Sequence, residues 1–89
     1  MLEITISNQF KKDFKKYKTN KSITEEFKLF IDLICNQRKL PQKYKEHALI
    51  GNYKNYRECH LKPDILIIYK ISKINLTLVR IGSHSELFK

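Results

Sequence analysis

Hydrophobic residues recur with the period of a strand at the N-terminus and with the period of a helix after it. The alternation over residues 2–6 predicts a short, half-buried strand. A first helix is then predicted, capped by Ser7 and burying one apolar face, which is formed by Phe10, Phe14 and Tyr17. A second helix opens at the capping-box pattern of Ser22 and Glu25 and ends near residues 35–37. Its buried stripe is formed by Ile23, Phe27, Phe30, Ile31 and Ile34.

The second half of the chain returns to the period of a strand. Residues 38–55 have no clear period and are expected to form a long basic loop along the surface. Three strands are predicted after it, with turns at Pro63-Asp64 and at residues 73–75, over residues 56–61, 65–72 and 75–82. The order is β-α-α-β-β-β. It predicts a single α+β domain over residues 1–89, with two N-terminal helices packed on one face of a small, mostly antiparallel four-stranded sheet.

Composition adds a possible class of partner. The chain of 89 residues carries 18 Lys and Arg against nine Asp and Glu, a net charge of +9. Folding does not require such an excess, which favours a polyanionic partner, although a lysine-rich solvated surface is the simpler alternative. No segment approaches the roughly 18 apolar residues of a membrane span, and the N-terminus lacks the features of a signal peptide. We therefore expect a cytoplasmic protein with no membrane partner, in which Cys35 and Cys59 are buried hydrophobic residues.

Ionisable residues cluster where the second and fourth predicted strands meet the loops. Alternation places Glu58 and His60 on one face of their strand, with Cys59 and Leu61 turned to the core. If Val79 and Ile81 point inward on the last strand, Arg80 faces the same open surface, and the remaining candidates lie in the loop, the turn and the C-terminal segment: His47, Asp64 and His84. Such a group suits cleavage of RNA, since the 2′-hydroxyl needs a base, the leaving 5′-oxygen an acid and the phosphorane a fixed positive charge. No metal or other cofactor is required for this chemistry.

Simpler interpretations exist for each of these residues. A histidine in a loop, such as His47, is often a surface hydrogen-bonding residue, His60 can cap its turn, and Arg80 can pair with Glu58 as a structural ion pair. A zinc site is a sharper alternative, with a shell formed by His47, His60, Asp64 and His84. Short ligand spacing is absent and Arg80 would add positive charge nearby, so we do not favour zinc.

Three segments carry a specific resemblance: KYKEHALIG in the loop, YRECHLKPD in the strand and RIGSHSELF at the end. With them the chain resembles the YafQ-type toxins of the RelE/ParE superfamily over nearly its whole length. The resemblance implies a RelE-like fold and a ribosome-dependent, metal-independent endoribonuclease that cuts mRNA in the ribosomal A site. It also implies a cognate antitoxin, usually acidic, whose C-terminal region wraps the toxin, and contact with operator DNA only through that complex.

The resemblance also implies roles for individual residues. It suggests a catalytic group of His47, His60, Asp64 and His84, with Arg80 stabilising the scissile phosphate. We expect His84 to be the general acid, and His60 or His47, oriented by Asp64, to be the base. Phe88 is expected to stack on a base of the mRNA, although without the resemblance an apolar plug of the core would be favoured. Glu58 is a secondary candidate for the base, and Glu58 and Lys54 are candidates for substrate binding.

Two other functions remain open from the sequence. ParE-type relatives poison DNA gyrase through protein contacts and lack the histidine-rich site, so the joint presence of His60, Asp64 and His84 argues against that activity. A basic RNA-binding module without catalysis is the other alternative. It differs in its response to His84→Ala, which would leave binding intact in both cases and abolish cleavage only in an enzyme.

Overall fold

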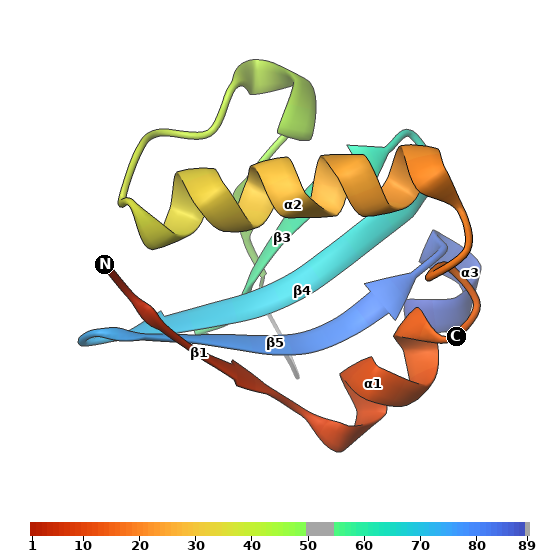
Figure 1. Ribbon diagram of the computed structural model, residues 1–89, viewed down its shortest axis with the longest axis horizontal. Coiled ribbons are helices and arrows are strands. Elements are labelled where there is room, and N and C mark those ends of the chain that lie inside the picture. Colours follow the sequence, from red (N-terminus) through yellow and green to blue (C-terminus); the bar gives the residue numbers. More distant parts are fainter. Residues whose placement is uncertain (50–54, 89) are drawn as a thin grey trace.

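The computed structural model describes residues 1–49 and 55–88, in which two helices cover one face of a five-stranded sheet (Figure 1). The sheet has the order β1-β5-β4-β3-β2; β1 is parallel to β5 and the other pairs are antiparallel. The elements follow one another as β1 (Glu3–Ile6), α1 (Asn8–Phe14), α2 (Lys21–Cys35), the 3-10 turn η1 (Gln42–Tyr44), β2 (His47–Ala48), β3 (Arg57–Lys62), β4 (Ile65–Ser72), β5 (Asn75–Gly82) and α3 (His84–Leu87).

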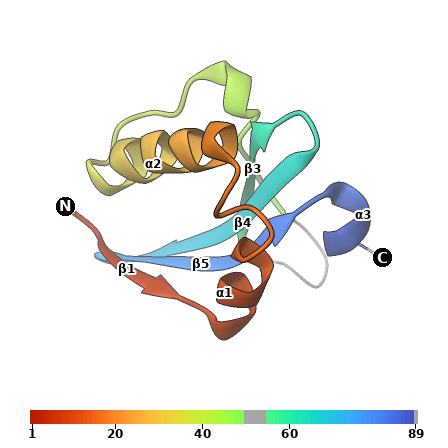
Figure 2. The ribbon, with the colours of Figure 1, turned by 45° about the vertical axis from the view of Figure 1, so that its right-hand side comes forward.

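The predicted α+β architecture is confirmed, but the predicted number of strands is wrong. The fifth strand is β2, which lies inside the segment expected to be a loop and pairs with β3. Two residues are too short to leave a period in the sequence. The short helix α3 was not predicted either. It follows directly from the end of β5, on a part of the molecule away from α2 (Figure 2).

The N-terminal strand is at the edge of the sheet and is less buried than its pattern predicts. Leu2 is buried, but Ile4 and Ile6 are 45% and 42% exposed. The reason is that β1 lies beside a shallow cleft of about 360 Å³ instead of under the helices, and Ile4 forms part of the lining of that cleft. Alternation therefore predicted the strand correctly, but it did not predict that the apolar side chains of the strand lie beside an open cleft.

The helices form largely as predicted, with a different cap on α2. The Ser7 side chain accepts a hydrogen bond from the Phe10 amide at the start of α1. In α2 the expected capping box is wrong: Asn20 is the cap, and its side chain accepts from the Ile23 amide at 3.1 Å. Asn is as good a cap as Ser, so the helix starts early enough to include Ser22. The buried stripe is confirmed, with Ile23, Phe30 and Ile34 buried.

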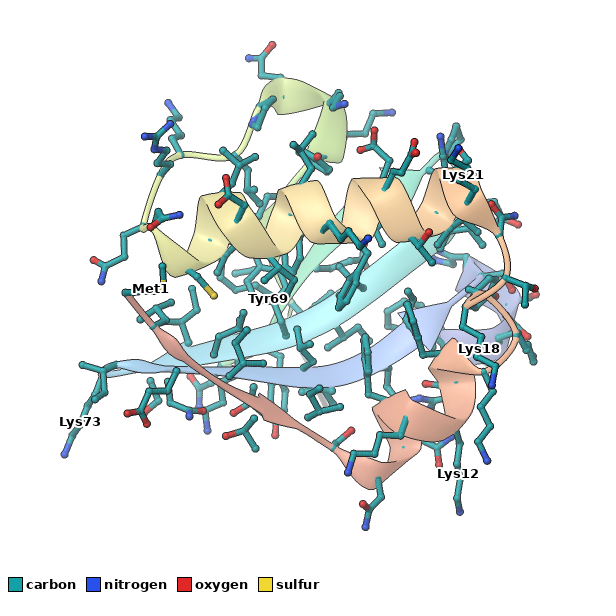
Figure 3. The ribbon with its side chains drawn as sticks, in the orientation of Figure 1. Met1, Lys12, Lys18, Lys21, Tyr69 and Lys73 are labelled. Carbon is teal, nitrogen blue, oxygen red and sulfur yellow. The ribbon has the colours of Figure 1, made fainter. Side chains whose placement is uncertain are left out.

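The sheet has an apolar layer on each face. The larger layer lies under α1 and α2, where Phe30 meets Tyr69 edge to face at 5.1 Å between ring centroids; Tyr69 is labelled between α2 and the sheet in Figure 3. The second layer, on the opposite face, is formed by Leu66, Ile68 and Leu87 with half-buried neighbours: Leu49, Tyr56, Val79 and Phe88. We call it the second apolar layer. It forms the floor of the candidate site.

A β-bulge changes the faces of β5 from those predicted. The register with β4 shifts between Ile68 and Tyr69, so Val79 packs in the second apolar layer while Ile81 stays in the main core. Val79 and Ile81 thus do not share a face, as the sequence had suggested. The start of α1 lies at the edge of β5 just past the last residue of β1. There the Ser7 hydroxyl donates a hydrogen bond to the Val79 carbonyl at 2.8 Å. Within residues 1–49 and 55–88, no helix is long and apolar enough to cross a bilayer.

Candidate active site

Strand pairing places three of the candidate residues in one row across the sheet. His47 on β2 pairs with Glu58 on β3, Glu58 pairs with Ile68 on β4, and Ile68 pairs with Arg80 on β5. Directly paired residues point to the same face. The next row runs from His60 through Leu66 to Gly82. The Cα atoms of Glu58 and Arg80 are about 10 Å apart, since neighbouring strands are spaced by about 4.8 Å.

Glu58 is a buried carboxylate between two imidazole rings. Its side chain is 3% exposed, and its Oε1 atom lies 3.3 Å from Nε2 of His47 and 3.8 Å from Nε2 of His60. The sequence predicted that Glu58 and His60 share a face, which is confirmed. It placed both on an open surface, which is wrong for Glu58. Burial of a carboxylate is costly unless it is paired, and the partner that this geometry offers is an imidazole protonated at Nε2.

The other ring nitrogen of each histidine faces a main-chain carbonyl. Nδ1 of His47 lies 2.9 Å from the Lys45 oxygen, and Nδ1 of His60 lies 3.3 Å from the Pro63 oxygen. A carbonyl oxygen can only accept, so Nδ1 carries the hydrogen in both rings. Nε2 of each ring is therefore the nitrogen that faces the Glu58 carboxylate.

The segment that carries His47 is anchored through its neighbour Glu46. The Glu46 carboxylate accepts hydrogen bonds from the Arg57 guanidinium and from the Tyr69 hydroxyl, the latter at 2.8 Å. The bond from Arg57 is the main cause that lowers the pKa of Glu46 below its usual value. Tyr69 is fully buried, and burial together with this carboxylate raises its pKa, so its hydroxyl remains a donor.

A second tyrosine fixes the other end of the same segment. Tyr44 is fully buried, and its hydroxyl donates to Oε2 of Glu26 on α2 at 3.1 Å. Burial, with the Glu26 bond, raises the pKa of Tyr44 to about 12. Lys45 follows in a left-handed turn with φ of 46°. The turn directs the Lys45 carbonyl at His47, so the histidine is positioned from both sides.

Arg80 is held by a carboxylate that the sequence analysis missed. Its Nε donates to Oδ2 of Asp13 at 2.7 Å and its Nη2 to Oδ1 at 3.2 Å, a bidentate ion pair. Asp13 also accepts from the Ile81 amide at 3.2 Å. Burial alone would raise the pKa of Asp13, but the bonds from Arg80, Gln9 and Ile81 outweigh it and lower the pKa. A structural ion pair for Arg80 does exist, but its bidentate partner is Asp13, not the expected Glu58.

The short helix α3 carries His84 and leads into Phe88. The two rings are 4.9 Å apart at their centroids, tilted by 44°, and Phe88 is half-buried against the second apolar layer. Ser83 and Glu86 form a capping box at the start of the helix. Glu86 also accepts from Lys16 and, at 3.0 Å, from the Tyr17 hydroxyl, which ties α3 to the end of α1.

Two further features fix the position of α3. A Cβ atom at Gly82 would lie 3.1 Å from Oε1 of Glu86 and 3.3 Å from Cδ2 of Leu87, so glycine allows the helix to fold back closely onto the strand. The Lys16 bond is the main cause that lowers the pKa of Glu86 to about 2. Burial and the Glu86 bond raise the pKa of Tyr17 to about 12.

The expected residues therefore fall into distinct groups. His47 and His60 meet at Glu58, His84 and Phe88 meet on α3, and the second apolar layer lies between the two groups. Asp64 is exposed in the β3–β4 turn and contributes to the raised pKa of Tyr17. The carboxylate in contact with the imidazoles is Glu58, whereas Asp64 was expected to orient them.

Two other expectations concern metal and Lys54. Among the described residues, no group of three or more His, Cys, Asp and Glu side chains could hold a metal ion, so the zinc shell of His47, His60, Asp64 and His84 is not formed there. Lys54 lies outside the described residues.

Comparison with known proteins decides the family. Residues 2–89 match the family model described as a bacterial toxin of type II toxin–antitoxin systems, YafQ. The chain is 39% identical over 87 residues to the mRNA interferase toxin YafQ of Escherichia coli K12, covering 97% of this chain and 95% of that protein. The chain belongs to the YafQ family. The resemblance expected from the sequence is thereby confirmed, and an mRNA interferase, as the relative is named, is an endoribonuclease.

Solved structures of YafQ-family proteins agree with the fold. A crystal structure of YafQ from E. coli BL21(DE3) superposes with a TM-score of 0.89 at 33% identity, covering both chains completely. The toxin of the E. coli DinJ–YafQ complex gives 0.87 at 36% identity, again over both whole chains. A copper-bound mutant toxin from Helicobacter pylori gives 0.91 at 38% identity, over 99% of this chain and all of that one.

The residues missed by sequence reasoning are those whose hydrogen bonds hold the candidate residues in place. Some of them left a signal. Asp13 is the single acid in α1, amid lysines, and Ser83 with Glu86 has the spacing of a capping box. Glu46, Tyr44 and Tyr69 left none, because their hydrogen bonds join segments far apart in the chain.

Proposed function

We propose that this YafQ-family protein is a ribosome-dependent, metal-independent endoribonuclease that cuts mRNA in the A site. The observation that carries the proposal is the pair of imidazoles on the buried Glu58, across an apolar floor from a third imidazole on α3. General acid–base cleavage of RNA needs a base and an acid on opposite sides of the phosphate. The cytoplasm, where ribosomes are, is the proposed location.

In the proposed reaction, Nε2 of His60 or His47 takes the proton of the 2′-hydroxyl. The 2′-oxygen forms a bond to phosphorus, and the bond from phosphorus to the 5′-oxygen breaks. His84 gives a proton to that leaving oxygen, so the products are a 2′,3′-cyclic phosphate and a 5′-hydroxyl. Exchange of protons with water then resets the histidines.

The remaining candidates have supporting parts in this reaction. Arg80, oriented by Asp13, supplies positive charge to the phosphorane, and such a fixed donor is worth about 3–4 kcal/mol of barrier. Phe88 provides a ring beside His84 for stacking on a base. Glu58 acts by holding the two imidazoles, Asp64 acts from the exposed β3–β4 turn, and Lys54 contacts the substrate.

A cognate antitoxin is the proposed protein partner. The E. coli relative is known in complex with DinJ. The exposed Ile4 and Ile6 line apolar clefts whose rims carry Lys11, Lys15, Lys18 and Lys28. An acidic amphipathic segment complements such a surface, and we propose that the antitoxin's C-terminal region occupies it. Operator DNA would then be contacted only through the complex.

The test is cleavage on programmed ribosomes. Purified ribosomes carrying a short mRNA are incubated with the protein in EDTA, and the 5′ ends of the products are mapped. We expect cuts confined to the A-site codon, absent with mRNA alone and absent with His84→Ala. Intact mRNA despite tight ribosome binding would instead support a non-catalytic RNA-binding module. Intact mRNA without binding would favour a gyrase poison.

A further inference from the structure

A pocket of about 300 Å³ is lined by His60 and shares no lining residue with the second apolar layer. It is enclosed by η1, the N-terminal half of α2 and the β3–β4 turn, and Leu61 and Pro63 contribute apolar lining. Its volume is at the lower end of the range for small-ligand sites, about 300–1,000 Å³. The pocket is thus large enough for a phosphate with part of its nucleotide.

The polar lining of this pocket is mainly basic. Three lysines reach it from different segments, Lys43 in η1, Lys45 in the turn after it and Lys62 at the end of β3; we call it the lysine pocket. The acid in its lining, Glu26, is already engaged. Its Oε1 lies 3.3 Å from the Lys43 ammonium, and its Oε2 accepts from the Tyr44 hydroxyl.

The other two ammonium groups are not neutralised by the protein. Within residues 1–49 and 55–88, neither Lys45 nor Lys62 has an ion pair or a side-chain hydrogen bond. Two such positive charges at the mouth of one pocket repel each other, and an anion between them removes that repulsion.

The lysine pocket is also structurally continuous with the candidate active site. His60 belongs to both, since Nε2 lies near Glu58 while the residue lines the pocket. Lys45 belongs to both as well, because its carbonyl faces Nδ1 of His47. A strand of RNA held at the histidines therefore passes directly beside the two lysines.

We propose that the lysine pocket is a subsite for the mRNA being cut, where Lys45 and Lys62 bind a backbone phosphate of a nucleotide next to the scissile one. This proposal rests on the proposed function, in that it assumes that RNA enters the candidate site. Binding energy from such a remote phosphate places the scissile bond against the histidines. An acidic protein segment or ribosomal RNA is a different occupant, and the test separates them.

The experiment measures binding of a short single-stranded RNA that carries a 2′-deoxy nucleotide at the cleavage position and so stays intact. Fluorescence anisotropy over a series of salt concentrations compares the wild type with the double variant Lys45→Gln/Lys62→Gln. Each phosphate contact on a single strand contributes about −0.7 to the slope of log K against log salt. Because the two lysines are proposed to bind one phosphate, we expect the double variant to make the slope shallower by about 0.7.

A matched control removes the same charge elsewhere. Lys12 is exposed on α1 and Lys73 lies in the β4–β5 turn, both away from the β3–β4 turn and η1 (Figure 3). Lys12→Gln/Lys73→Gln should leave the slope within 0.3 of the wild type. Equal loss in the two double variants would overturn the proposal, as would a wild type that binds no RNA at low salt. Melting temperatures of both variants should match the wild type, because all four side chains are at the surface.

Two further arms separate the occupants and the functions. Vacant ribosomes should bind the Lys45→Gln/Lys62→Gln variant as tightly as the wild type; weakened binding there with an unchanged RNA slope would assign the pocket to ribosomal RNA and overturn the proposal. A synthetic acidic peptide that competes with the RNA only in the wild type would assign it to a protein. Cleavage on programmed ribosomes is scored separately, with His84→Ala as the inactive reference. If the wild type cuts mRNA but the Lys45→Gln/Lys62→Gln variant keeps the wild-type salt slope for RNA binding, the subsite is disproved and the proposed function is not.

Discussion

At the scale of single residues, Glu58 is the carboxylate that lies against both imidazoles of the candidate site. Its carboxylate is buried and lies within 4 Å of both Nε2 atoms, closer to His47 than to His60. Glu58 was only a secondary candidate in the sequence analysis, because alternation shows which face a residue is on but not how deeply it is buried.

Glu58→Gln tests this carboxylate. An amide keeps the shape but removes the negative charge that would stabilise a proton on Nε2 of either ring. We expect kcat for cleavage on programmed ribosomes to fall at least about tenfold, with a changed pH dependence, while a ring-orienting role alone would leave the shape of the pH profile intact. The free energy of unfolding should change by less than about 1–2 kcal/mol, and a variant that cleaves at the wild-type rate would contradict the assignment.

At the scale of elements, features that depend on local interactions were predicted from the sequence, and features that depend on contacts between distant segments were not. The helix α2 and the strands β3, β4 and β5 were predicted to within one or two residues, since their signals are local periods and turns. What failed depends on partners far away in the sequence. The two-residue β2 forms because Tyr69 and Arg57 hold Glu46 beside it, and the bulge that turns Val79 over is visible only in the pairing with β4.

The candidate site shows the same difference between local and long-range features. The residue types at the site were accessible from the sequence, through the histidines and the family motifs. Their supports were not, as with Asp13, which reaches Arg80 across 67 positions, and Tyr17, which reaches Glu86 across 69.

Tyr69→Phe tests whether the segment of β2 is positioned from the sheet. The change removes the hydroxyl that donates to Glu46 but leaves the ring against Phe30. A hydrogen bond to a charged group is worth about 1.5–3 kcal/mol, so the free energy of unfolding in urea should fall by up to that amount. Because His47 follows Glu46 directly, we also expect a lower kcat with little change in KM.

The matched control is Tyr44→Phe, which removes a similar buried hydroxyl from Glu26. We expect a comparable loss of stability from it and a smaller loss of kcat, since Glu46 keeps both of its donors. Equal kinetic effects of the two variants would mean that general loosening of the segment, not the anchor at Glu46, controls the histidine.

At the scale of the whole molecule, the net charge is +9, and several of the few acidic side chains each contact basic or hydroxyl groups. Asp13 holds Arg80, Glu46 holds Arg57 and Tyr69, and Glu86 holds Lys16 and Tyr17. Each of the three carboxylates has a lowered pKa. The acids are scarce: Asp13 and Glu46 link α1 and the 42–48 segment to the sheet, and Glu86 links α3 to the end of α1.

This arrangement predicts loss of stability in acid. A carboxylate whose pKa is lower in the folded state binds fewer protons there than when unfolded, so stability rises with pH and is lost as the pH falls through the folded pKa. For Glu86 the window runs from the ordinary value of 4.5 down to about 2. Protonation also adds to an already large positive charge, which favours expansion.

The measurement is urea unfolding at several pH values between 6 and 2 for the wild type and Glu86→Gln. We expect Glu86→Gln to have a lower free energy of unfolding than the wild type at pH 6. Below pH 4.5 the variant should lose less of this free energy than the wild type, because glutamine at position 86 does not bind a proton. Glu3→Gln, a change at an exposed carboxylate on β1, is the control and should follow the wild-type curve. Parallel curves for the wild type and Glu86→Gln would show that the link between α3 and α1 does not depend on the charge of this carboxylate.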